Sequence, residues 1–252
     1  MVTLGKVMRS TAVVAALVAT SAFGAPNVTA TKHNLSFSSM NAIKNGVADG
    51  GDVCVYCHTP HGSNTAFVGA PIWNKTHIDT ATAFTVYGSG AVGGTSGTTI
   101  ATTPVGLPGD VSTACLSCHD GVSAINSVIN APGSGGYNPT GTGDLRAFLY
   151  NTTTTVTAGT VLNMATATST GISNIGKDLR NDHPIGVAYT VGKAGLVADT
   201  STFSGTTTTI ASVLRGGKVE CSSCHDPHEA NPLFLRTIDN ASSKLCTSCH
   251  TK

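Results

Sequence analysis

Charged and aromatic side chains are both scarce in this sequence of 252 residues. Only 11% of the residues are charged, and the formal net charge is +1. A protein that binds nucleic acid needs a basic surface to neutralise phosphates, so this balance argues against a nucleic-acid partner. Aromatic residues make up 5% of the chain, with Trp73 as the single tryptophan, so a core built from side chains alone would be thin. The length allows one or two domains.

The most hydrophobic segment, at the N-terminus, is not long enough to span a membrane. Two basic residues precede an unbroken apolar run from Ala12 to Ala19, which is too short to cross a bilayer. Small residues at Ala22 and Gly24 then match the positions that a signal peptidase reads. We therefore predict a cleaved signal peptide over residues 1–24 and a single exported domain over residues 25–252, without a transmembrane span. A retained N-terminal anchor is the alternative interpretation of the same run.

All eight cysteines lie in four copies of one motif, Cys-x-x-Cys-His. This is the attachment pattern of c-type haem, in which the cysteines hold the porphyrin and the histidine binds the iron. Disulfides and zinc sites are the ordinary alternatives for paired cysteines, but neither requires a histidine after every second cysteine. We therefore predict four covalently attached c-type haems. The thioether residues would be Cys54, Cys57, Cys115, Cys118, Cys221, Cys224, Cys246 and Cys249, and the proximal iron ligands His58, His119, His225 and His250.

The spacing within the motif suits a single helical turn. Residues i, i+3 and i+4 lie on one face of such a turn, so both sulfurs and the imidazole can reach the same porphyrin. Each haem is a large apolar body, and four of them would replace much of the core that the composition lacks. We expect the chain without haem to be largely unfolded, because the polypeptide alone buries little apolar area.

The first and third motifs continue into a second histidine, in CVYCHTPH and CSSCHDPH. His61 follows His58 by three residues, so both rings project from the same side of one turn. The two axial sites of an iron lie on opposite faces of the porphyrin, so His61 cannot complete the haem that His58 holds. By the same argument, His228 serves an iron other than the one bound by His225. Alternatively, His61 and His228 are exposed turn residues that follow a proline.

Five further histidines are available as distal ligands for four irons. Methionine is the other usual distal ligand, but Met40 and Met164 stand in no recognisable setting, so we expect bis-histidine ligation at every haem. Such irons have low reduction potentials and no vacant site for a substrate. We therefore predict an electron-transfer protein and not an enzyme. An ordinary position in a turn, in the N-terminal tail or on the surface is the alternative for each candidate. The candidates are His33, His61, His77, His183 and His228.

Between the motifs the chain is rich in glycine, serine and threonine, as in YGSGAVGGTSGTTIATTPVG and APGSGGYNPTGTG. Such segments rarely form long helices, although threonine supports short strands. We predict a multihaem c-type cytochrome fold with mostly irregular chain, short helices at the haem motifs, few short strands and a core of stacked haems. The clearest helix is expected over residues 112–130, with Ser112 as its N-cap. No repeated unit longer than the haem motif is evident in the sequence.

Several segments resemble multihaem c-type cytochromes with doubled Cys-x-x-Cys-His motifs, which metal-reducing bacteria export. These segments are KHNLSF, CVYCHTPHG, APIWN, CLSCHDG, NDHPIG and CSSCHDPHEANPLFLR. With four haem motifs on a chain of this length, the sequence is similar to the OmcE-type tetrahaem cytochromes, which polymerise into extracellular filaments. The resemblance implies that the matching histidines are distal ligands and that His77 is the spare one. Carried over, the distal ligands are His33, His61, His183 and His228.

The same resemblance implies partners and a location. We expect a head-to-tail polymer at the cell surface or outside the cell, in which His61 or His33 of one subunit ligates a haem of the next. Its other partners would be redox cytochromes and extracellular electron acceptors. A soluble monomeric tetrahaem shuttle in the periplasm is the first alternative. A haem reductase with one vacant iron site is the second.

Overall fold

The computed structural model describes residues 28–75, 84–87, 105–132, 144–150, 153–167, 171–237 and 240–251. Within these ranges most of the chain is irregular, as predicted, and the helices are short. The α-helices are α1 (Asp110–His119), α2 (Met164–Ala167), α3 (Ile210–Val213), α4 (Cys221–Cys224) and α5 (Lys244–Cys249). Single 3-10 turns occur at Val28–Ala30, Cys54–Tyr56, Leu179–Asn181, Pro232–Phe234 and Ala241–Ser243. The predicted signal peptide, residues 1–24, lies outside the described residues.

The described strands are two or three residues long and pair antiparallel, so the expectation of few short strands is confirmed. One sheet has the order β1-β4-β5 and consists of β1 (Lys44–Asn45), β4 (Phe148–Tyr150) and β5 (Thr154–Val156). Asn45 lies opposite Phe148 in its register. Two separate pairs consist of β2 (Ser127–Val128) with β3 (Asp144–Leu145), and β6 (Val187–Ala188) with β7 (Lys218–Val219).

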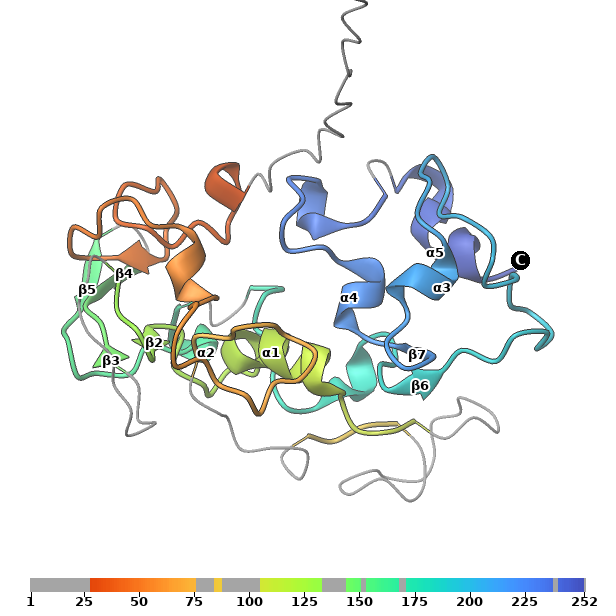
Figure 1. Cartoon of the computed structure of the whole chain (residues 1–252), viewed down its shortest axis with the longest axis horizontal. Coiled ribbons are helices and arrows are strands. Elements are labelled where there is room, and N and C mark those ends of the chain that lie inside the picture. Colours follow the sequence, from red (N-terminus) through yellow and green to blue (C-terminus); the bar gives the residue numbers. More distant parts are fainter. Residues whose placement is uncertain are drawn as a thin grey trace, which may run out of the picture.

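The described elements are arranged along the long axis of the molecule. Figure 1 shows β1, β4 and β5 at one end, together with the first described segments of the chain. α3, α5 and the C-terminus lie at the other end, and α1 and α4 lie between the two ends. Within the described ranges, no helix is long and apolar enough to cross a membrane.

The helix α1 differs from its prediction at both ends. Gly109 is its N-cap, and the helix ends at His119, well before the expected end. Ser112 is therefore not the cap but lies inside the first turn, where its hydroxyl donates a hydrogen bond to the distant Glu220 carboxylate. Gly121 has a positive φ of 77° just after the helix, a conformation that commonly ends helices. The predicted helix was thus right in type and wrong in extent.

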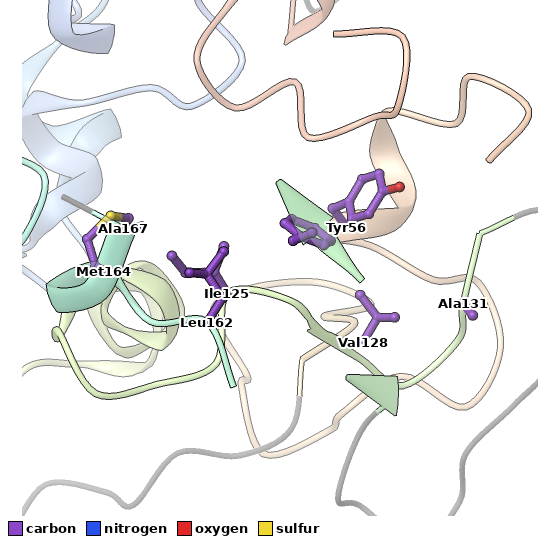
Figure 2. Packing of buried hydrophobic residues seen from close by; sticks show 8 residues of the cluster. Tyr56, Ile125, Val128, Ala131, Leu162, Met164 and Ala167 are labelled. Atoms are coloured by element: carbon purple, nitrogen blue, oxygen red, sulfur yellow. The ribbon is translucent and has the colours of Figure 1, made fainter. Parts of the chain in front are cut away.

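Buried apolar side chains form several small clusters in the described part of the chain. One cluster surrounds Tyr56 and Phe148, whose ring centroids are 5.9 Å apart in an edge-to-face arrangement. Figure 2 shows Tyr56 with other members of this cluster. Tyr56 stands between Cys54 and Cys57, so this cluster supports the first haem motif. Other clusters include Leu116 in the second motif and the partly buried Cys249 in the fourth. The motifs therefore contact different clusters, although Cys118 of the second motif also packs against the first cluster.

Three of the four haem motifs belong to a longer structural unit. In each, another segment of the chain runs antiparallel beside the motif and forms the same two backbone hydrogen bonds; it follows the motif in the first and third cases and precedes it in the fourth. The residue that follows the motif's histidine donates its N–H to a backbone carbonyl of the adjacent segment. The residue two positions further along that segment donates its N–H to the carbonyl of the motif's second cysteine. We call the residue that accepts the first bond the return residue. The return residues of the first, third and fourth motifs are Ile72, Phe234 and Gly195. This repeat is one of backbone contacts, and the sequence shows no repeated unit longer than the haem motif.

All three return residues have a positive φ. The values are 50° at Ile72, 59° at Phe234 and 88° at Gly195. Glycine adopts this conformation freely, whereas a side chain raises its cost by about 1–2 kcal/mol. The first and third motifs therefore hold a strained residue where the fourth has a glycine. This difference explains why no shared residue type marks the repeat in the sequence.

Candidate haem-binding site

Each haem motif is a helical turn, as its spacing predicts. In the first, third and fourth motifs the histidine N–H donates to the carbonyl of the first cysteine, at 2.8, 3.1 and 2.9 Å. The second motif is the end of α1. All eight cysteines are free thiols in the structure, so none is engaged in a disulfide. Both cysteines of each motif are thus available to one bound group.

Cysteines of successive motifs lie close together in chain order. The neighbouring pairs are Cys57 with Cys118, Cys115 with Cys221, and Cys224 with Cys249. Burial raises the pKa of Cys57 and of Cys224 to about 11, and the neighbouring thiol adds to each shift. The four attachment motifs therefore follow one another in space from the first to the fourth.

Polar contacts between α1 and α4 hold the second and third motifs together. Glu220, the N-cap of α4, is only 3% exposed. Its carboxylate accepts hydrogen bonds from the Ser112 hydroxyl and, at 3.1 Å, from the Gly109 N–H. The Ser112 hydroxyl in turn accepts the N–H of Cys221 at 3.0 Å. A buried carboxylate is stable only with such donors, so this network fixes the starts of both helices relative to each other.

Three pairs of imidazole rings share nearly the same separation. Their ring centroids are 6.1, 6.2 and 6.3 Å apart for, respectively, His58 with His228, His33 with His119, and His183 with His250. An imidazole nitrogen binds a transition metal at about 2.0–2.1 Å, so two rings on opposite sides of one ion have centres about 6 Å apart. Each pair joins a distal candidate to a proximal histidine. The structure thus brings these six rings to the spacing of axial ligands.

The position of His228 is informative because this residue belongs to the third motif. Its ring lies beside His58 of the first motif, with an angle of 19° between the ring planes. The spacing argument required His228 to serve an iron other than that of His225, and the structure places it accordingly. The ligand assignments themselves stay predictions.

Backbone carbonyls orient the proximal histidines. Nδ1 lies within hydrogen-bond distance of a carbonyl oxygen in three of them, namely His58 with Pro71 (2.9 Å), His119 with Ser173 (2.7 Å) and His225 with Leu233 (2.8 Å). In the first and third motifs this carbonyl directly precedes the return residue. An imidazole that donates from Nδ1 presents a free Nε2 lone pair, which is the form that binds a metal. The returning chain therefore sets the ring orientation.

The surroundings of the half-buried His33 favour its neutral form. Burial, and then the neighbouring His119, lower the pKa of His33 to about 4. Burial likewise lowers the pKa of His119. The His33 ring stacks on Phe234 with centroids 4.2 Å apart and planes at 13°. Because Phe234 is the return residue of the third motif, one side chain links that motif to the distal candidate of the second.

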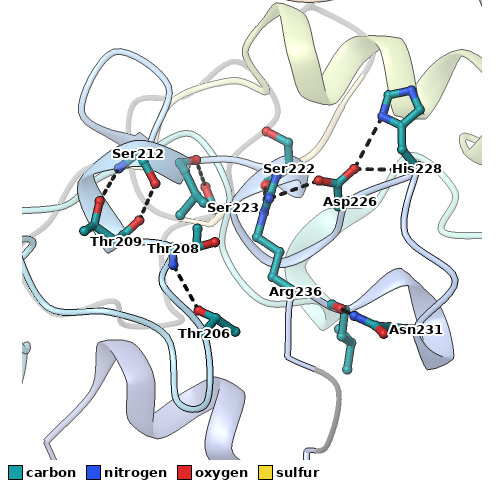
Figure 3. Close-up of polar contacts among 12 residues, drawn as sticks. Thr206, Thr208, Thr209, Ser212, Ser222, Ser223, Asp226, His228, Asn231 and Arg236 are labelled. Atoms are coloured by element: carbon teal, nitrogen blue, oxygen red, sulfur yellow. Dashed lines mark hydrogen bonds and ion pairs between the residues drawn. The ribbon is translucent and has the colours of Figure 1, made fainter. Parts of the chain in front are cut away.

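Asp226 and Arg236 support His228 and were missed by the sequence reasoning. Asp226 accepts the backbone N–H of His228 at 3.1 Å, and its carboxylate lies 3.4 Å from the ring Nδ1 (Figure 3). Arg236 donates to the other carboxylate oxygen at 3.1 Å. Such an outer partner fixes the orientation of a metal-binding histidine. The carboxylate between the two histidines of CSSCHDPH was the signal that could have indicated Asp226.

Two further predicted ligands, His61 and His225, are not paired with another imidazole among the described residues. The His61 side chain is exposed, and among the described residues no histidine ring lies near it at the separation of the three pairs. The same holds for His225, which has a carbonyl partner but no paired imidazole within the described ranges. His77 lies outside the described residues.

The residues present fit haem better than a bare metal ion. Within the described ranges, no three histidine, cysteine or acidic side chains converge as a metal-ion site. The histidines meet in twos, as the axial ligands of a haem do, and free cysteines stand beside the proximal ones. The indole N–H of Trp73 is buried without a hydrogen-bond partner, and its ring lies 5.7 Å from that of His58. This N–H is a donor that a haem carboxylate could use.

The motifs and the paired imidazoles are those expected of a c-type cytochrome. Residues 212–252, which contain the third and fourth motifs, match the doubled CXXCH motif family. The chain is similar to that family over this region, and the match indicates covalent haem binding and electron transfer. A search of curated proteins found no match.

Proposed function

We propose that this protein transfers electrons through four covalently bound c-type haems, each ligated by two histidines. The proposal depends chiefly on the three imidazole pairs at 6.1–6.3 Å. His58 and His228 would ligate the first haem, His119 and His33 the second, and His250 and His183 the fourth. Two histidines on each iron would leave no coordination site for a substrate, so we propose an electron carrier and not an enzyme.

The order of the motifs supports conduction along the molecule. Neighbouring cysteines come from the first and second, second and third, and third and fourth motifs. Haems attached to these cysteines would follow one another without a gap, so an electron entering at one end could leave at the other. Three proximal rings donate hydrogen bonds to carbonyls, and the half-buried His33 stacks on Phe234. These contacts would hold the ligands in place and limit reorganisation when an iron changes its charge.

The protein is further proposed to be the subunit of an extracellular filament. The exposed His61 and the unpaired His225 are the supporting observation, because a ligand and a haem site would each lack a counterpart among the described residues. A bond from His61 of one copy to the haem at His225 of the next is a head-to-tail contact. Such contacts produce an open polymer when they do not close into a ring. His33 is the weaker candidate for this contact, since its ring already lies beside that of His119.

Cryo-electron microscopy of native protein sheared from the cell surface would test the filament directly. We expect filaments in which an unbroken line of haems passes through the subunit boundaries and His61 reaches the neighbouring copy. Uniform single-subunit particles with His77 bound at the His225 haem would instead establish a soluble shuttle. Mass spectrometry of the haem peptides provides the independent count, and fewer than four modified motifs would contradict the tetrahaem proposal.

A further inference from the structure

A buried lysine lies against the first haem motif. Lys75 is 2% exposed, and its ammonium donates hydrogen bonds to the carbonyl oxygens of Ile125 and Ser127 at 2.5 and 2.8 Å. No ion pair joins it to a carboxylate among the described residues. Carbonyl dipoles stabilise the ammonium but leave its net positive charge in place. A charge in this low-dielectric surrounding acts strongly on its neighbours.

The backbone fixes Lys75 close to the haem attachment site. The preceding residue, Asn74, donates its N–H to the carbonyl of Cys57 at 2.8 Å. This is one of the two backbone bonds that pair the returning chain with the motif. The ammonium acts on the sulfur of the same cysteine: burial raises the pKa of Cys57, and Lys75 opposes that rise.

A second buried charge near this motif faces different groups. Asp49 is 2% exposed and accepts hydrogen bonds from the Tyr56 hydroxyl at 2.5 Å and from the Phe37 N–H at 2.8 Å. Its negative charge is felt at Tyr56, whose pKa is raised by burial and then by Asp49. Among the neighbouring ionisable groups, Lys75 therefore has the largest effect on Cys57, and Asp49 is not one of them.

The third motif has a buried charge of the opposite sign in a comparable place. Glu220 directly precedes Cys221, and its carboxylate is held by Ser112 and Gly109. It raises the pKa of Cys221, against the lowering effects of Cys115 and Ser112. Fixed charges of opposite sign therefore stand beside two motifs of one molecule. A positive charge favours the reduced, less positive iron, and a negative charge favours the oxidised one.

We propose that the buried ammonium of Lys75 raises the reduction potential of the haem attached at Cys54 and Cys57 above that of the other haems. This inference rests on the proposed function, since it assumes a haem at the first motif. A single electron added to the molecule then resides preferentially at the end that carries His58. In this proposal Lys75 acts through its charge and not as a ligand of the iron.

The test is a redox titration of the intact four-haem protein, with dithionite as reductant and soluble mediators, followed by haem absorbance. Lys75→Met and Lys75→Gln should lower the potential of the highest component, whereas Lys75→Arg, which keeps the charge, should leave it in place. The Gln variant also keeps hydrogen-bond donors for the two carbonyls. Lys218→Met removes the same charge from an exposed side chain and should shift no component, because solvent screens it.

A variant without the first haem, Cys54→Ala with Cys57→Ala, assigns the shift. Its titration should lack the highest component, and adding Lys75→Met should change nothing further. Unchanged potentials in Lys75→Met and Lys75→Gln, or an equal fall in Lys75→Arg, would overturn the inference while four haems and their titration remain. Absence of haem from the wild-type peptide containing Cys54 would instead refute the proposed function.

Discussion

The first and third haem motifs share a sequence pattern and a backbone arrangement, yet their second histidines have different surroundings. In both, a return residue with positive φ pairs with the motif, and the proximal Nδ1 contacts a carbonyl. In the third motif, the carboxylate of Asp226 holds His228 beside His58. In the first, Thr59 replaces Asp226 and donates to the His61 carbonyl, at 3.1 Å, instead of holding the ring.

The residue between the two histidines is the local difference between these motifs. Both second histidines are exposed, and the His228 side chain is 50% accessible. The Asp226 carboxylate lies near the His228 ring, whereas Thr59 contacts the His61 backbone carbonyl. If both rings are distal ligands as proposed, the carboxylate fixes the ring that is used within one copy, and the threonine leaves the other ring without that restraint.

Removing either second histidine should have the largest effect and should separate their roles. In His228→Ala, the first haem loses its proposed distal ligand and becomes high-spin, and one haem in the molecule binds carbon monoxide. In His61→Ala, we expect the His58 haem to stay low-spin and assembly into filaments to fail. Absorbance with carbon monoxide and electron microscopy measure the two effects.

Covalent haem content is the control for this pair, because both variants retain every cysteine. The comparison fails if His61→Ala alone makes the His58 haem five-coordinate. It also fails if His228→Ala leaves all haems closed to carbon monoxide.

Changing the residue between the histidines should have an intermediate effect. Asp226→Asn removes the charged partner of His228, so its dissociation from the iron should become about 10-fold easier, the lower range for loss of an outer-shell partner. The rate of carbon monoxide binding to the reduced protein measures this. Thr59→Asp is the matched variant, which introduces a carboxylate beside His61 and should leave that rate unchanged. Equal rates in wild type and Asp226→Asn would show that the carboxylate does not position the ring.

Substitutions at the return residue should have the smallest effect, which is on the stability of the fold. Gly195→Ala places a side chain at a φ of 88° with no atom within 4 Å of the new Cβ, so the cost is backbone strain alone. We expect a loss of about 1 kcal/mol in the free energy of unfolding, measured by chemical denaturation followed by circular dichroism. Ile72→Gly relieves the same strain in the first motif and should lose little or no stability, since Ile72 is 47% exposed. A larger loss in Ile72→Gly than in Gly195→Ala would show that the side chain at this position matters more than its φ.

The local parts of the site could be predicted from the sequence because they depend on short spacings. A helical turn follows from Cys-x-x-Cys-His, and the separation of His225 from His228 excludes a shared iron. The partner of His228 could not be predicted, because His58 lies far away in the chain and no spacing connects them. The extent of α1 was missed because Ser112 is a good capping residue whose hydroxyl instead serves the distant Glu220.

The repeated return segment could not be predicted for a different physical reason. Its contacts are backbone hydrogen bonds, which isoleucine, phenylalanine and glycine can all make. A positive φ is usually marked by glycine, but Ile72 and Phe234 adopt it because the surrounding contacts stabilise it. The haem count, the filament and the distal assignments stay predictions.

The contact between Cys115 and Cys221 has a consequence for how the protein is made. Cys115 and then Ser112 are hydrogen-bonded to Cys221 and lower its pKa, which favours the thiolate, the form that attacks other sulfurs. In an oxidising compartment, two thiols this close can join into a disulfide, which would take one cysteine from the second motif and one from the third. If the motifs carry haem as proposed, haem has to be attached before these cysteines meet. We therefore expect haem attachment to precede folding.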